Sequence, residues 1–174
     1  MLLKKIRFFS SCREELHRIG LAEALICGSV TAFASVLVRG VSGSPYRCIN
    51  FLHLHGVIPP VWLMSMLWFV WHFIIGATMG AVMGNSNFCC GIPKYRGGMF
   101  WVLMTVFGLI WYPMFFCAEM MFFSMLDVLV VLALSVICAI DFFRVYKLCG
   151  FVMALYSFWL LWMFTLNFRA FIGA

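Results

Sequence analysis

Tryptophan is the residue type with the clearest potential for binding chemistry in this 174-residue chain, which contains 7 of them. Several stand in long apolar segments, close to another ring or to a polar side chain. Side chains three or four residues apart share one face of a helix, and converging faces of this kind can surround a flat conjugated or sterol-like ligand. The candidate ligand-binding side chains are Trp62, Trp68, His72, Trp111, Tyr156, Trp159, Met163 and Asn167.

Residues for ordinary enzymatic catalysis or for a metal site do not form a recognisable pattern. The sequence has no Ser/His/Asp or paired-carboxylate constellation, so we expect no catalytic residues and no metal site. The adjacent Cys89 and Cys90 could bind a soft metal, but no second Cys/His pair lies nearby at zinc-ligand spacing. We therefore interpret them as ordinary loop thiols.

Two polar side chains inside apolar segments need a separate explanation. His72 could ligate the metal of a haem, but we expect it to form a hydrogen bond to a neighbouring helix. Asp127 is costly within a membrane helix and is therefore a functional candidate. A structural partner, such as Arg39, a tyrosine or an indole N–H, is the alternative for Asp127.

The composition predicts an integral membrane protein. Hydrophobic residues make up 66% of the chain and charged residues 10%, which leaves too little polar surface for a soluble globule. Because about 20 apolar residues cross a bilayer, we predict an all-α bundle of five transmembrane helices in one membrane domain, 19–174, after a cytoplasmic segment, 1–18. The expected helices are about 19–38, 57–83, 97–117, 120–143 and 148–168.

The first apolar segment could also be a cleaved signal peptide, because residues 32–34 resemble a small-x-small cleavage site. The polar lead is long for a signal peptide, however, and Glu23 interrupts the apolar run, so we expect this helix to be retained.

Basic residues predict the orientation of the chain. The expected loops and ends on one side contain nine of the 12 Lys and Arg residues, including five before the first helix. The positive-inside rule therefore places the N-terminus in the cytoplasm and the C-terminus outside. Because the basic residues flank apolar segments, the formal charge of +6 does not indicate nucleic-acid binding. Without an organelle-targeting leader, a bacterial plasma membrane is expected; a mitochondrial outer membrane is the alternative.

The second apolar segment combines prolines, rings and glycines in one order. Pro59 and Pro60 can begin a helix, where their missing N–H groups cost nothing. From Trp68 a spacing of four continues through His72 to the glycines, and the glycines permit close approach of another helix. The ridge is Trp68, His72, Gly76, Gly80 and Gly84.

This segment resembles the TspO family, also called translocator protein, tryptophan-rich sensory protein or peripheral benzodiazepine receptor. Its run PPVWLMSMLWFVWHFIIGATMG is similar to the Pro-Pro-x-Trp pattern of the second family helix. LIWYPMFF at 109–116 is similar to the third-helix Leu-Trp-x-Pro-x-Phe-Phe element, and LYSFWLLWMFTLNF at 155–168 to the fifth-helix element. The chain departs from the family at Gly108, where an asparagine is usual, and at His72, where a tyrosine is usual.

The resemblance implies a five-helix homodimer with an outward-opening pocket for a porphyrin, such as protoporphyrin or haem, or for a sterol-like ligand; no cofactor is required. Pro59, Pro60 and Gly108 complete the candidate site. Besides the small ligand and a second copy, membrane lipid is the expected partner. Two alternatives are open: a ligand-free scaffold protein, whose rings only fill the bundle or lie in interface belts, and an enzyme that degrades porphyrin photo-oxidatively through Trp68 and Trp159.

Overall fold

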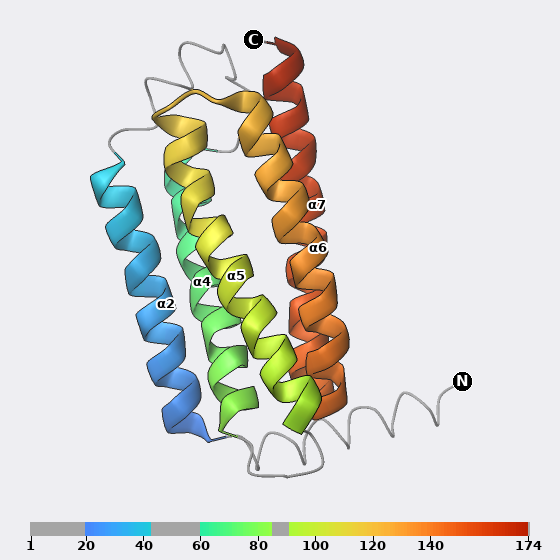
Figure 1. Ribbon diagram of the computed structural model, residues 1–174. Coiled ribbons are helices and arrows are strands. Elements are labelled where there is room, and N and C mark those ends of the chain that lie inside the picture. The colour runs from blue at the N-terminus through green and yellow to red at the C-terminus, as the bar shows by residue number, and fades with distance from the viewer. Residues whose placement is uncertain (1–19, 43–59, 85–90, 174) are drawn as a thin grey trace, which may run out of the picture.

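A computed structural model describes residues 20–42, 60–84 and 91–173, and these residues form an antiparallel bundle of long helices (Figure 1). The described residues form five helices, and each is long and apolar enough to cross a membrane. The shortest, α2, has 21 residues and spans about 31 Å at 1.5 Å per residue, which matches a bilayer core. The predicted all-α five-helix fold is confirmed. The helices are α2 (Leu21–Val41), α4 (Val61–Met83), α5 (Gly91–Phe116), α6 (Met121–Val145) and α7 (Lys147–Gly173).

Two helix boundaries differ most from the sequence prediction, by five or six residues. Helix α5 begins at Gly91, before the expected start near 97, because Pro93 lies in the first turn, where a missing N–H is tolerated. Helix α7 continues past 168 to Gly173 because the apolar sequence resumes after Arg169 with Ala170, Phe171 and Ile172. Helix α4 begins directly after Pro60, its N-cap. Pro59, the segment 1–18 and the Cys89–Cys90 pair lie outside the described residues.

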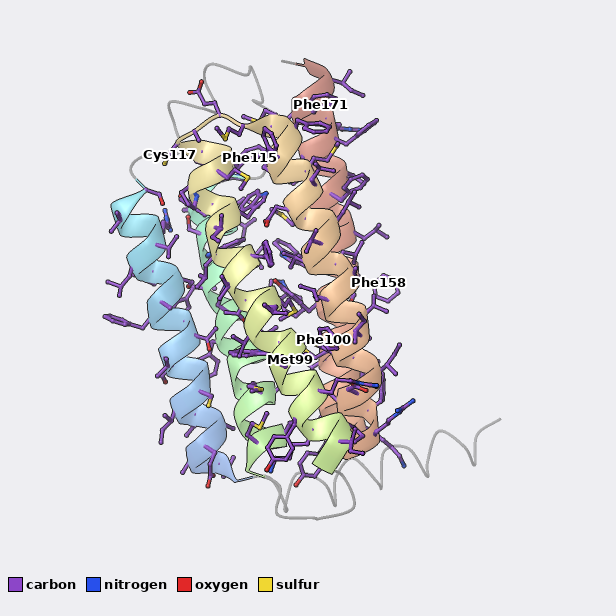
Figure 2. All side chains as sticks on the ribbon, in the orientation of Figure 1. Met99, Phe100, Phe115, Cys117, Phe158 and Phe171 are labelled. Atoms are coloured by element: carbon purple, nitrogen blue, oxygen red, sulfur yellow. The ribbon has the colours of Figure 1, made fainter. Side chains whose placement is uncertain are left out.

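The helices pack in a closed ring. Helix α2 contacts α4, α4 contacts α7, α7 contacts α6, α6 contacts α5, and α5 returns to α2 (Figure 1). Side chains on the outside are apolar and exposed: Phe158 on α7 points away from the bundle, whereas Phe115 on α5 lies inside (Figure 2). The exposed apolar side chains suit a lipid solvent.

The glycines of α4 allow the close approach of another helix, as the sequence predicts, and the structure shows that this helix is α2. A Cβ atom on Gly76 would lie 2.5 Å from the Thr31 hydroxyl oxygen, and one on Gly80 would overlap the backbone of Glu23 and Ala24. Only glycine permits this approach of the two helix backbones. The α2–α4 contact is therefore a close small-residue seam.

The two ends of the bundle differ in content. At one end, where α5 begins and α6 finishes, Gly80, Gly97 and the buried Phe142 lie close to neighbouring helices; we call this the glycine end. At the other end, where α5 finishes and α6 begins, Trp111 and Phe115 form a core with residues of α6 and α7; we call this the aromatic end. The aromatic end is the upper one in Figure 1.

Candidate functional site

A small cavity lies in the bundle toward the aromatic end, between α4, α5, α6 and α7. Its volume is about 10 Å³, which is room for about one water molecule. Helix α4 contributes one tryptophan, α5 a glycine and a tryptophan, and α6 and α7 the remaining walls. The lining residues are Trp68, Gly108, Trp111, Asp127, Val128, Val131, Tyr156, Trp159, Leu160 and Met163.

The cavity is small because the aromatic rings pack on one another. The rings of Trp68 and Trp111 have centroids 5.2 Å apart, although they come from different helices. On the α7 side, Trp71 of α4 contacts Tyr156 and Trp159, with centroids at 5.5 and 6.2 Å. These separations are typical of favourable aromatic pairs. The rings that could hold a flat ligand thus fill the space themselves.

Hydrogen bonds fix one of the rings. The indole N–H of Trp111 donates to the Asn167 side-chain oxygen over 3.1 Å, and Ser124 donates to the same oxygen, also over 3.1 Å. The Asn167 amide nitrogen donates to the Met163 carbonyl. A buried asparagine therefore connects α5, α6 and α7 and holds Trp111 in place. By contrast, the indole nitrogen of Trp68 is buried without a hydrogen-bond partner.

One carboxylate faces these rings. Asp127 of α6 is 7% exposed, and its Oδ2 atom has no hydrogen-bond partner. Tyr156, whose hydroxyl lies 3.9 Å from where a Gly108 Cβ would be, lines the cavity with it. The partners that the sequence suggested for Asp127 do not pair with Oδ2, and Arg39 interacts with Tyr112 instead.

Among the described residues, no group of three or more His, Cys, Asp or Glu side chains is placed to hold a metal ion. The arrangement of rings, glycine and carboxylate instead suits a flat apolar molecule with few polar groups.

The comparison with family models agrees with the sequence motifs: the TspO/MBR family model matches residues 22–172. The chain belongs to the TspO/MBR family. Neither the curated proteins nor the solved structures contain a match to it. With its five apolar helices, this TspO/MBR family member is an integral membrane protein.

Several of the predicted ligand-binding residues in this TspO/MBR chain meet at the cavity, and others do not. Those that line it are Trp68, Gly108, Trp111, Tyr156, Trp159 and Met163. Pro60 and Trp62 are exposed at the start of α4; Trp62 is 67% exposed. Asn167 lies behind Trp111, as described above. A ligand contact by any of these residues stays a prediction.

The prediction for His72 was wrong in one respect. Its Nδ1 atom lies 2.8 Å from the Trp68 carbonyl oxygen of its own helix, whereas a neighbouring helix was expected to supply the partner. Its Nε2 atom is buried without a partner. The His72 ring packs on Trp68, with centroids 4.5 Å apart, so it supports the wall of the cavity from behind.

Sequence reasoning missed several residues at the site. Trp71 was not among the predicted site residues, although it follows Trp68 by three positions and so shares its face. Val128, Val131 and Leu160 also line the cavity. No sequence signal distinguishes these aliphatic residues from others in the bundle, because every segment is rich in them.

A second, larger hollow lies beside the cavity, between α2 and α4. Its volume is about 260 Å³, and Trp68 belongs to its wall as well as to that of the cavity. Its other lining residues are Ser35, Val36, Arg39, Ser65, Met66 and Phe69. Trp68 therefore borders both spaces.

Proposed function

We propose that this protein binds a flat, apolar ligand of the tetrapyrrole or sterol class among the rings of α4, α5 and α7, and acts as a receptor or carrier for it. One observation supports this proposal above all: Trp68, Trp111, Tyr156 and Trp159 come from three helices and line a single cavity. Rings that only anchored the bundle at the membrane interfaces would lie near its ends and would not need to line one interior space.

The proposed ligand requires the cavity to enlarge. Sites for drug-sized ligands occupy roughly 300–1,000 Å³, whereas this cavity has about 10 Å³. Rotation of Trp68 would join the cavity to the adjoining hollow of about 260 Å³. Because no hydrogen bond holds the Trp68 indole nitrogen, this ring is freer to turn than Trp111, which Asn167 fixes. A ligand would then enter the joined space from the membrane, through the hollow between α2 and α4.

The proposal also includes an orientation. The distribution of basic residues supports a cytoplasmic N-terminus, which puts the aromatic end outside and the glycine end inside. A reporter fused after Ala174 should then read as external and one fused before Met1 as cytoplasmic. The opposite pattern would place the cavity on the cytoplasmic side of the bilayer.

A titration tests ligand binding. Purified protein is titrated with protoporphyrin, and the tryptophan emission and porphyrin absorbance are followed; we expect saturable quenching. Stacking on one ring is worth about 1–3 kcal/mol, so Trp159→Ala should weaken binding from a few-fold to over a hundredfold while the bundle stays folded.

The matched control is Phe158→Ala, which removes the neighbouring ring of the same helix. Phe158 is 71% exposed and points away from the bundle (Figure 2), so this change should leave the affinity unaltered. Quenching that never saturates, and is equal in wild type and Trp159→Ala, would show partition into detergent and support the scaffold alternative.

A further inference from the structure

Asp127 is the one acidic side chain among the residues that line the cavity, and no basic one lines it. It lies within the α6 span, in a wall that is otherwise mostly rings and aliphatic groups. Burial of a carboxyl oxygen away from water is unfavourable unless a donor satisfies it. The Oδ2 atom is nevertheless buried with no hydrogen-bond partner.

Among the described residues, no group donates a hydrogen bond to Oδ2. The Tyr156 hydroxyl lies in the same wall, but it is not bonded to this atom. The Trp68 indole N–H also lines the cavity, but it too has no partner, so it does not reach Asp127. Arg96 of α5 pairs with Asp141, the other buried aspartate of α6, at the glycine end. The Asn167 amide nitrogen donates to the Met163 carbonyl. Ring faces and aliphatic groups make up most of the remaining wall, and they cannot donate a conventional hydrogen bond.

An occupant of the enlarged cavity would therefore meet an acceptor that nothing else satisfies. Gly108 leaves space beside the Tyr156 hydroxyl, because the nearest atom to a Cβ there would be 3.9 Å away. A donor on the ligand gains a hydrogen bond at Oδ2, and a ligand without one leaves the oxygen buried and unpaired. This difference makes Asp127 a selective contact.

We propose that Asp127 Oδ2 accepts a hydrogen bond from an N–H or O–H group of the ligand, so that the site selects flat apolar molecules carrying a hydrogen-bond donor. This inference rests on the binding function proposed above and narrows its ligand class. It assigns Asp127 a contact with ligand and no part in a chemical step.

Two probes that differ in one donor test the inference. Acridone is a flat tricyclic molecule with one N–H and one carbonyl group, and N-methylacridone has the same rings and carbonyl without the N–H. Both are titrated into purified protein, and their displacement by protoporphyrin is measured. We expect acridone to bind about tenfold more tightly than N-methylacridone, the effect of one hydrogen bond to a buried acceptor.

Variants separate the hydrogen bond from the shape of the methyl group. Asp127→Leu removes the acceptor and replaces a costly acidic side chain with an apolar one, which suits a membrane helix. The affinities for acridone and N-methylacridone should then become nearly equal. Asp127→Asn keeps one acceptor oxygen and should retain part of the preference. Ser135→Ala is the control on the same helix: Ser135 bonds to Leu132 and Ser157 away from the cavity, and its loss should leave the preference unchanged.

The outcomes are distinguishable. A preference for acridone that is the same in wild type and Asp127→Leu would show that the methyl group acts by size alone, and would overturn the inference. Equal binding of both probes in the wild type, or acridone that fails to compete with bound protoporphyrin, would also overturn it while leaving the pocket intact. Absence of saturable binding by all three molecules would instead remove the proposed function itself.

Discussion

The two ends of this bundle contain the same kinds of polar group in opposite states. At the glycine end, Asp141 is fully buried and forms a two-point ion pair with Arg96, with distances of 2.8 and 2.5 Å. Toward the aromatic end, Asp127 of the same helix is also buried, but its Oδ2 atom has no partner. Each end thus contains one buried carboxylate of α6, and within the described residues only Asp141 has both oxygens bonded.

The tryptophans repeat this contrast. Trp101 donates its indole N–H to the Ile75 carbonyl over 3.0 Å, whereas the Trp68 indole nitrogen has no partner. Buried polar groups are normally satisfied, and exceptions need an explanation. At the glycine end Asp141 and Trp101 are thus satisfied, whereas Asp127 and Trp68 keep polar atoms without partners although Trp111 and Asn167 nearby are bonded. This difference agrees with the proposal that a ligand binds beside Trp68 and Asp127. The predictions below test this division.

The largest effect is expected from a change at the glycine seam. Gly80→Leu forces a side chain into the backbone of Glu23 and Ala24, so α2 and α4 must separate. We expect a loss of about 3 kcal/mol in folding free energy, the upper end of the range for overpacking, because the clash is with backbone. It should be visible as early melting or aggregation in detergent. Gly40→Leu is the control, because nothing lies within 4 Å of a Cβ there. Normal melting of Gly80→Leu would show that the seam can open.

Removal of Trp101 should affect stability and not binding. Trp101→Ala loses a ring packed on the core and the hydrogen bond to Ile75, at an expected cost of about 3 kcal/mol. Protoporphyrin affinity, measured on the folded fraction, should change less than in Trp159→Ala. If Trp101→Ala weakened binding as much as Trp159→Ala, the division between the two ends would be wrong.

A smaller effect is expected from the ion pair. Arg96→Ala leaves the Asp141 carboxylate buried and unpaired, which should lower the melting temperature by about 5 °C. This decrease is smaller than for the loss of a fully buried ion pair, because the Arg96 side chain is 47% exposed. The double variant Arg96→Ala/Asp141→Leu should recover most of the loss, since no charge is then unpaired. Asp127→Leu should be neutral or stabilising. If Arg96→Ala were as stable as the wild type, the ion pair would have no structural role.

The sequence predicted much of this arrangement because the relevant rules are local. Apolar length predicts the spans, and spacing of four predicts that Gly76 and Gly80 lie on one ridge. Spacing along α5 and α7 also placed Trp111, Tyr156 and Trp159 on faces that could converge. The structure brings them together.

Other features depend on contacts between distant segments, and the sequence did not predict them. Whether rings line an open space or fill it depends on side-chain rotamers and packing from four helices, so the small volume could not be foreseen. A ligand contact by Asn167 stays a prediction, but the sequence did not predict that its side-chain oxygen accepts hydrogen bonds from Trp111 and Ser124. The contact of Trp71 with Tyr156 likewise joins α4 to α7, and no local pattern specifies that pairing.

The smallest expected effect sharpens the comparison at the aromatic end. Gly108 stands where the third family helix usually has asparagine, and the space beside it is open, with the Tyr156 hydroxyl 3.9 Å from a Cβ. Gly108→Asn adds an amide donor to the cavity wall and should strengthen binding of fluorenone, which has a carbonyl, by a few-fold to about tenfold. Fluorene has the same rings without the carbonyl and should bind as before, or more weakly because the new side chain takes up space. Equal gains for both molecules would mean that the asparagine acts by reshaping the cavity, and a loss for both would mean that this end cannot admit another polar group.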